Sequence, residues 1–257
     1  MTNLKITTLQ TNLVWENIEA NLSQLGNKLN KFVNTSDIII LPEMFTTGFS
    51  MNPAKLAEFP SGKTFTWLKE QALKTNAVIT GSYIVKENSH YYNRLVWMEP
   101  NGTFQTYDKK HLFSLSAEPA HYTAGKERLI VTYKGWKICP LICFDLRFPV
   151  WSRNTENYDL LIYVANWPEK RAHHWQSLLM ARAIENQVYT IGVNRVGIDG
   201  NQSNHSGDTS VIDYNGSILV HTAHVETSNT VELDYHQQQD FRQKLQFLAD
   251  RDAFQLD

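Results

Sequence analysis

The stretch GWKICPLICFDLRFPVW, residues 135–151, contains an apolar run that ends at Cys143 and is followed at once by an aromatic residue, an acid and an arginine. The run is typical of a strand covered on both faces, so the thiol stands where the strand leaves the core. Residues four apart on one strand lie roughly 13 Å apart, whereas a disulfide needs Cα atoms within ~7 Å. The only two cysteines, Cys139 and Cys143, are therefore not expected to pair. Each is either a buried apolar filler or a reactive thiol, and we expect Cys139 to be the buried one.

Strand and helix signals alternate in the first half of the chain, whereas hairpins appear in the middle and near the end. Apolar residues at spacings of three and four predict a helix after the first strand: Trp15, Ile18, Leu22, Leu25 and Leu29. Asn215-Gly216 is a strong hairpin turn. This mixture predicts two mixed sheets packed together with helices outside. No Gly-rich fingerprint follows the first strand, which argues against a doubly wound dinucleotide fold.

Composition narrows the class of protein. The 257 residues contain no repeat, low-complexity tract or Pro/Gly-rich linker, so we expect a single domain over residues 1–257. The formal charge of -2 gives no basic field for nucleic acid. The N-terminus is too polar for a signal peptide, and no apolar stretch reaches the ~20 residues of a membrane span. We therefore expect a cytoplasmic protein without membrane or nucleic-acid partners.

Several predicted strands end in residues that carry chemistry. The run DIIILP leads to Glu43, TFQTYD leads to Lys109, Lys110 and His111, WKICPLI leads to Cys143, and LLIYVAN ends in Asn166. In covered α/β sheets, ligands bind at the carboxyl ends of strands. An acid, a cation and a thiol are thus expected to face one pocket.

Each of these residues also has a purely structural interpretation. Glu43 suits a helix N-terminus, Lys109 and Lys110 suit a solvated turn, and Cys143 suits packing. A thiol with a pKa of about 8.5 is mostly protonated near neutrality and needs a base or cation beside it to act as a nucleophile. Glu43 as the base, Lys109 as the stabiliser of the thiolate and oxyanion, and the backbone N–H of Phe144 as a second oxyanion donor would explain the strand ends together.

Three motifs in this order resemble those of the nitrilase (carbon–nitrogen hydrolase) superfamily: LPEMF at 41–45, YDKKHLF at 107–113 and CFDLRFP at 143–149. The segments ANWP and ARAIENQ extend the resemblance over nearly the whole chain. It implies an α/β fold in which two mixed sheets form a four-layer α-β-β-α sandwich. It further implies that two copies pair through outer helices into a homodimer or a larger homo-oligomer.

The resemblance also implies residue roles. Glu43 becomes the general base, Cys143 the nucleophile and Lys109 the oxyanion stabiliser, because the family pattern Tyr-x-Lys-x-His-Leu selects Lys109 rather than Lys110. Glu118 matches the family's second glutamate, which is expected to position the lysine or the attacking water. The alternative interpretation of Glu118 is a solvent-exposed acidic residue in a loop. The implied reaction forms a thioester and uses water, with no metal and no organic cofactor.

Within the superfamily, the flanks LPEMFTTGFS, LRFPVWSRN and YVANWP resemble the omega-amidase branch. That branch hydrolyses the terminal amide of 2-oxoglutaramate or 2-oxosuccinamate to the dicarboxylic acid and ammonia. The far carboxylate of such a substrate needs a cation. Arg171, in a loop after a strand end, ranks first, whereas Arg147 also suits a structural anchor and Arg195 suits an ion pair with Asp199 or Asp208. We expect Phe45, Phe49 and Trp167 to line the pocket. The alternative interpretation of these side chains is ordinary core packing.

Other functions stay open at this point. The same three residues occur in nitrilases, N-carbamoyl hydrolases and acyl-amide hydrolases, so the resemblance of the triad does not choose among these enzymes. A catalytically silent binding protein is a further alternative. A redox or metal protein built on the two cysteines is disfavoured by their spacing. The helix from about residue 173 has a packing face made by Trp175, Leu178, Leu179 and Arg182, which is a candidate contact for a second subunit. Arg182 and Glu185 on this helix suit an ion pair.

Overall fold

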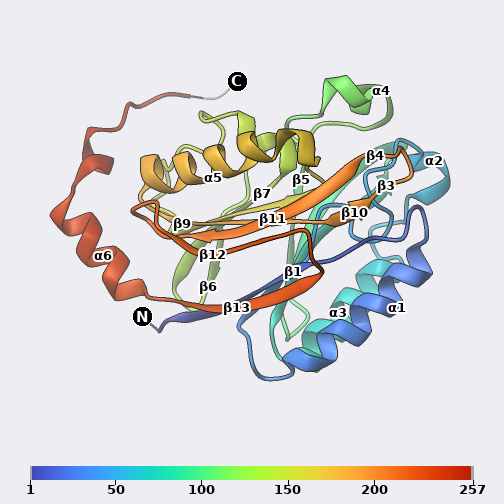
Figure 1. Ribbon diagram of the computed structural model, residues 1–257, viewed down its shortest axis with the longest axis horizontal. Helices are drawn as coiled ribbons and strands as arrows, with labels where there is room; N and C mark the ends of the chain where they lie inside the picture. The colour runs from blue at the N-terminus through green and yellow to red at the C-terminus, as the bar shows by residue number, and fades with distance from the viewer. Residues whose placement is uncertain (1, 256–257) are drawn as a thin grey trace.

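Two mixed β-sheets lie face to face in the computed structural model, which describes residues 2–255 (Figure 1). The first sheet has the strand order β13 (Thr227–Leu233), β1 (Leu4–Gln10), β2 (Ile38–Ile40), β3 (Val78–Glu87), β4 (His90–Met98) and β5 (Phe104–Asp108). The second has the order β10 (Val196–Ile198), β11 (Asn204–Ile212), β9 (Tyr189–Asn194), β8 (Leu160–Ala165), β7 (Trp136–Ile142) and β6 (Val131–Tyr133), with β12 (Ile218–Ala223) paired to β11.

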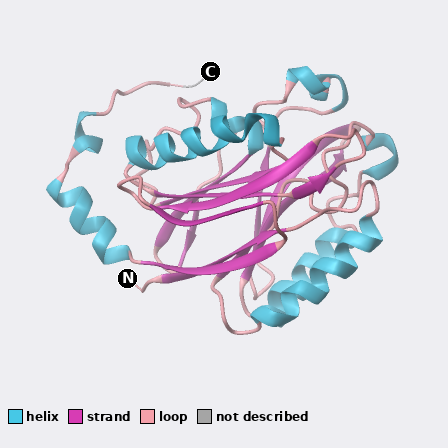
Figure 2. Ribbon diagram, viewed as in Figure 1, coloured by secondary structure: helices cyan, strands magenta, loops and turns pink. Residues whose placement is uncertain are grey.

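Helices cover both outer faces of this pair of sheets (Figure 2). Helices α1 (Ile18–Leu29) and α3 (Lys63–Thr75) lie on the first sheet, and α5 (Ala172–Asn186) lies on the second. Helix α6 (Tyr235–Lys244) lies at the side. Short helices occupy the connections: α2 (Pro53–Leu56), α4 (Glu118–His121) and the 3-10 turns Asn30–Phe32, Ser114–Ser116, Cys143–Arg147, Glu169–Arg171 and Phe247–Asp250. Among residues 2–255, no helix is long and apolar enough to cross a membrane. The layered α/β sandwich is confirmed, whereas pairing of two chains through outer helices stays a prediction.

The parallel strands at the centre of each sheet fix where the site can form. In the first sheet β1, β2 and β3 are parallel, and in the second β7, β8 and β9 are parallel. The remaining ladders are antiparallel, as the predicted hairpins require. The carboxyl ends of the central parallel strands therefore collect at common edges, which is where the polar strand-end residues emerge.

The alternation of β2 shows how the layers are held together. Ile38 and Ile40 belong to the core between the sheets, whereas Ile39 packs with Leu25 of α1 and Leu68 of α3. Successive side chains of a strand point to opposite faces, so an unbroken isoleucine run serves both interfaces. Each fully buried side chain of this kind contributes roughly 1.5–3 kcal/mol.

The buried face of α5 packs on the chain's own second sheet. Trp175 and Leu179 lie over Gly192 of β9, and the indole of Trp175 donates to the carbonyl of Asp208. The expected ion pair of Arg182 with Glu185 is confirmed at 2.9 Å. The predicted packing face is thus a core contact of this chain.

Gly192 leaves no space for a side chain, so Gly192→Ala should lower the free energy of unfolding by roughly 1–3 kcal/mol. A Cβ there would lie 2.4 Å from Leu179 Cδ1 and 2.6 Å from Trp175 Cζ2. The matched control is Gly26→Ala within α1, where the nearest atom, on Trp67, is 3.6 Å away. That change should raise the free energy of unfolding by about 0.5–1 kcal/mol. Urea denaturation of both variants measures the difference, and equal stabilities would contradict the packing argument.

Candidate active site

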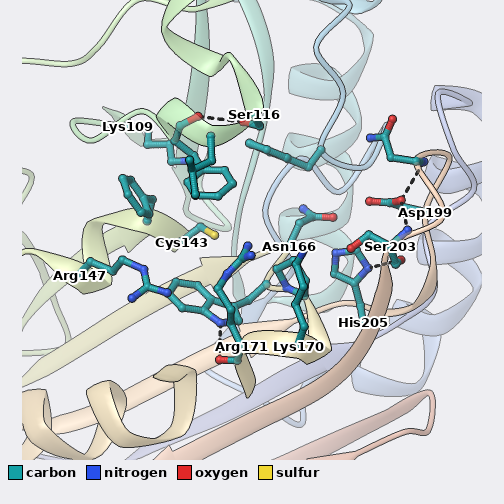
Figure 3. A pocket seen from close by; sticks show the side chains of 17 residues that line it. Lys109, Ser116, Cys143, Arg147, Asn166, Lys170, Arg171, Asp199, Ser203 and His205 are labelled. Carbon is teal, nitrogen blue, oxygen red and sulfur yellow. Dashed lines mark hydrogen bonds between the residues drawn. The ribbon is translucent and has the colours of Figure 1, made fainter. Parts of the chain in front are cut away.

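Four strand ends of the two sheets meet at one cavity. Glu43 follows β2, Lys109 follows β5, Cys143 follows β7 and Asn166 follows β8. Lys109, Cys143 and Asn166 line the cavity, and Glu43 lies buried directly behind them. Figure 3 shows Lys109, Cys143 and Asn166 around the same space. The structure therefore brings together the acid, the cation and the thiol that the sequence placed at separate strand ends.

The Glu43 carboxylate is fully buried and is held from several directions. Its Oε1 accepts hydrogen bonds from Lys109 Nζ at 2.9 Å and from Asn93 Nδ2 at 2.8 Å. Its Oε2 accepts the backbone N–H of Asn166 at 2.8 Å, and the Asn166 side chain donates to the Glu43 carbonyl at 2.5 Å. These contacts join the first sheet to the second and leave the carboxyl group with a single orientation.

Lys109 is buried between two carboxylates. Its Nζ donates to Glu43 and also to both oxygens of Glu118, at 3.1 and 3.0 Å. Burial alone would lower the pKa of the ammonium, but the charges of Glu118 and Glu43 outweigh it and raise the pKa above its usual value. Lys109 is thus a fixed cation, and its Nζ also lies 5.0 Å from the centre of the Phe49 ring.

Glu118 begins α4 and is buried rather than solvated. Its Oε2 accepts the N–H of Phe113 at 2.5 Å in addition to the Lys109 contacts. Burial raises the pKa of the Glu118 carboxyl, Lys109 opposes that effect, and Glu43 adds to it. Downstream, the N–H of Gly125 donates to the Lys109 carbonyl at 2.9 Å. A side chain would not fit there, because a Cβ would lie 2.1 Å from the Asp108 carbonyl oxygen.

Cys143 stands at a sharp turn between β7 and a 3-10 helix. Its φ is +42°, a left-handed conformation that costs a non-glycine residue of order 1–3 kcal/mol. Burial and the Glu43 charge raise the pKa of the thiol well above its usual value, although Lys109 opposes them. Both cysteines are free. Burial raises the pKa of Cys139 to about 12, and that residue lies in the core between strands rather than at the cavity.

The residue after the nucleophile candidate also faces the cavity. Phe144 lines it, and its N–H lies in the first turn of the 3-10 helix Cys143–Arg147, where backbone donors lack a partner within the helix. Its ring packs edge-on against Phe113 at 5.0 Å and Phe148 at 5.2 Å. The backbone at Phe144 is therefore firmly held beside the thiol.

The cavity has a volume of about 250 Å³ and carries charge of both signs (Figure 3). Its cations besides Lys109 are Arg147, Lys170 and Arg171. The Arg171 guanidinium lies 5.2 Å from the Phe113 ring centre and the Arg147 guanidinium lies 4.7 Å from that of Trp167. Burial lowers the pKa of Arg171 from its usual value, although Cys143 opposes the effect. The cavity can therefore receive an anionic group at its arginines.

One prediction about the cavity walls needs correction. Phe45 does not line the cavity, because the chain reverses at Met44, whose φ is +42°, and directs the ring into the core beneath α1 and α3 against Trp67 and Tyr83. Phe49 and Trp167 do line the cavity as expected.

Arg195 also lies away from the cavity lining. Its guanidinium is fully buried and donates to Asn12 Oδ1 at 2.7 Å and to the carbonyl of Val196 at 3.1 Å. The expected ion pair with Asp199 or Asp208 is absent from the salt bridges of the described residues. Burial lowers the pKa of Arg195 to about 10, and the charge of Asp199 opposes this.

Some site residues escaped the sequence analysis. Asn93 points inward from the middle of β4, and Asp145 lies under the Cys143 turn, where it accepts the N–H of Ile142. The loop between β10 and β11 and the start of β11 supply a further part of the wall: Asp199, Asn201, Ser203 and His205. Only Asp145 had a local signal, because it lies within the CFDLRFP motif. Within residues 2–255, no group of three or more His, Cys, Asp or Glu side chains is arranged to hold a metal ion.

Comparisons with known proteins agree with this geometry. Residues 5–243 match the family model described as carbon-nitrogen hydrolase. The omega-amidase YafV of Escherichia coli (strain K12) is 46% identical over 257 residues, which covers 100% of both chains. The 2-oxoglutaramate amidase of Bacillus subtilis (strain 168) is 32% identical over 251 residues, covering 95% of this chain and 96% of the relative.

A solved structure is similarly close. XC1258 from Xanthomonas campestris, a CN-hydrolase superfamily protein with an arsenic adduct in its active site, superposes with a TM-score of 0.99 at 41% identity, and 100% of each chain is covered. The chain belongs to the carbon–nitrogen hydrolase family, and it is a hydrolase that acts on amide carbon–nitrogen bonds.

The raised pKa of Cys143 gives a test of the site's electrostatics. Glu43→Gln removes the negative charge that helps to keep the thiol protonated, so the thiol pKa should fall. Alkylation by iodoacetamide at pH 7 should then become roughly tenfold faster for each unit by which the pKa falls. The rate is measured against pH in a Cys139→Ala background, so that only Cys143 can react. Slower alkylation at pH 7 in the variant would show that Glu43 does not hold the thiol neutral.

Proposed function

We propose that this hydrolase cleaves the terminal amide of a small 2-oxo dicarboxylic acid monoamide, 2-oxoglutaramate or 2-oxosuccinamate, to the dicarboxylic acid and ammonia. The observation that carries the proposal is the buried Glu43–Lys109–Cys143 arrangement beneath a cavity whose wall contains Arg147 and Arg171. The names of the relatives, omega-amidase and 2-oxoglutaramate amidase, support the same substrate class.

The first half of the proposed reaction forms a thioester. Glu43 accepts the proton of the Cys143 thiol as the sulfur attacks the amide carbon. Lys109 Nζ and the Phe144 N–H donate to the oxyanion of the tetrahedral intermediate. Glu43 then returns the proton to the leaving nitrogen, the carbon–nitrogen bond breaks, and ammonia departs. The high pKa of the buried thiol fits this scheme, because the proton stays on sulfur until the substrate arrives.

The second half consumes one water. Glu43 accepts a proton from water as the water oxygen attacks the thioester carbon, and the carbon–sulfur bond breaks. The released thiolate regains the proton, which restores Cys143 and Glu43 and frees the acid. One carboxyl group therefore acts in turn as base, acid, base and acid again. Glu118, whose two carboxylate oxygens also contact Lys109 Nζ, keeps the ammonium in place during both halves.

Ammonia release from 2-oxoglutaramate by the purified protein tests the proposal. The wild-type chain and Cys139→Ala should both turn the substrate over, whereas Cys143→Ala should lose at least about 10³-fold in kcat because the nucleophile is missing. Cys139→Ala is the matched control, since Cys139 is a buried thiol outside the cavity.

A panel of other substrates separates the alternatives within the family. It contains a nitrile, an N-carbamoyl amino acid and a simple acyl amide. Turnover of one of these through Cys143, with 2-oxoglutaramate ignored, would contradict the substrate proposal and leave the nucleophile in place. Equal turnover by Cys143→Ala would contradict the mechanism itself.

The arginines of the cavity make a second prediction. A charge-assisted hydrogen bond to the far carboxylate is worth about 1.5–3 kcal/mol, so Arg171→Gln should raise KM for 2-oxoglutaramate about 10- to 100-fold. Lys137→Gln, which removes an exposed cation outside the cavity lining, is the matched control and should change KM less than about threefold. Steady-state kinetics with 2-oxoglutaramate and with uncharged butyramide measure the contrast. A loss confined to Arg147→Gln would move the carboxylate site to Arg147.

A further inference from the structure

We propose that Asp145 is a positioning residue that holds the Cys143 turn and the Lys109 segment at a fixed separation. The inference rests on the proposed roles of Cys143 and Lys109. Asp145 is fully buried and does not line the cavity, so it acts through its neighbours and not on the substrate. Its carboxylate contacts the residue before Cys143 and one residue on each side of Lys109.

The first set of contacts holds the cysteine turn. Asp145 Oδ2 accepts the backbone N–H of Ile142, the residue before Cys143, at 3.0 Å. Asp145 itself lies two residues after Cys143, in the 3-10 helix that the cysteine begins. The carboxylate therefore bridges across the left-handed Cys143 and stabilises a backbone conformation that the cysteine alone disfavours.

The second set of contacts holds the lysine segment. Asp145 Oδ2 also accepts the hydroxyl of Tyr107 at 2.7 Å. Its Oδ1 accepts the backbone N–H of His111 at 3.0 Å and His111 Nδ1–H at 2.8 Å. Lys109 lies midway between Tyr107 and His111, so both ends of its short segment are tied to the same carboxylate.

Neighbouring aromatic residues keep these donors in place. The indole of Trp151 donates to the Tyr107 hydroxyl at 3.0 Å, and the N–H of Lys110 donates to it at 3.2 Å. The His111 ring stacks on Phe148 with a centroid distance of 3.7 Å. The donors around Asp145 are thus oriented in advance, and a buried carboxylate is the group that can accept all four.

An amide of the same shape cannot replace this carboxylate. In Asp145→Asn one oxygen becomes an NH2 group, which faces either the Ile142 N–H or the His111 N–H. A buried backbone donor then loses its acceptor. The variant keeps the volume of the side chain while loosening either the cysteine turn or the lysine segment.

The test compares Asp145→Asn with wild type in 2-oxoglutaramate hydrolysis. We expect kcat to fall about 10²-fold, the size of effect that a displacement of about 1 Å produces, with KM within about twofold. Asp159→Asn is the matched control. Asp159 is also buried and accepts the N–H of Lys137 at 3.0 Å, but it precedes β8 at the end of the sheet away from the cavity. The Asp159→Asn substitution should lower the melting temperature and leave kcat within about twofold of the wild-type value.

A double-mutant cycle distinguishes positioning from general destabilisation. Tyr107→Phe removes one donor to Asp145 and should lower kcat about tenfold in the wild-type background. In the Asp145→Asn background it should add little, because the two residues act as a unit. Losses in kcat that simply multiply, or a kcat in Asp159→Asn as low as in Asp145→Asn, would overturn the proposal.

Alkylation of Cys143 decides the question even if the substrate proposal fails. Loosening the turn admits water to the buried thiol and should speed iodoacetamide alkylation at pH 7, whereas loosening the lysine segment withdraws the cation that favours the thiolate and should slow it. In either case the rate should differ from wild type at least fivefold. Asp159→Asn should react at the wild-type rate. Alkylation of Asp145→Asn at the wild-type rate would overturn the positioning role, whereas a lack of ammonia release by wild type would count only against the proposed substrate.

Discussion

The Lys109 ammonium, buried between Glu43 and Glu118, is the contact on which the rest of the site depends. Removing ions from water costs several kcal/mol each even after the protein relaxes, and their attraction offsets this cost only when the geometry is good. The surrounding structure supplies that geometry. Asn93 and the Asn166 N–H hold Glu43, the Phe113 N–H holds Glu118, and the Gly125 N–H holds the lysine backbone. Because these groups come from both sheets and from the loop between them, the packing of the sheets and the charge arrangement stabilise each other.

Much of the fold could be predicted from the sequence, because its signals are local. The isoleucine run of β2, the spacing of α1 and the Asn215-Gly216 turn each depend on a few neighbouring residues. The candidate site could be located for a related reason: its residues follow strands, and the carboxyl ends of neighbouring parallel strands meet. The contacts between these residues could not be predicted in the same way. Asn93 reaches Glu43 from fifty residues away, and no local pattern distinguishes it from other buried polar residues of a strand.

The errors concern side-chain direction. Phe45 lies only two residues after Glu43, and an extended chain would place both on the same face. The left-handed Met44 breaks that alternation, and a methionine gives no sequence signal for such a conformation. Arg195 and Arg171 are alike in sequence, since each follows a strand end. One is enclosed by carbonyl groups of neighbouring loops and the other lies at the cavity, a difference created by segments distant in the chain.

The distribution of charge in the cavity bears on how the proposed reaction would turn over. At the thiol, two carboxylates surround one ammonium, so the reacting end carries no surplus of positive charge. The surplus lies at Arg147, Lys170 and Arg171. A substrate with a neutral amide and a distant carboxylate matches this arrangement in one orientation only. Hydrolysis changes the neutral amide into a second carboxylate beside Glu43, where like charges repel. The site would therefore bind the substrate through its unreactive end and favour departure of the product from its reactive end.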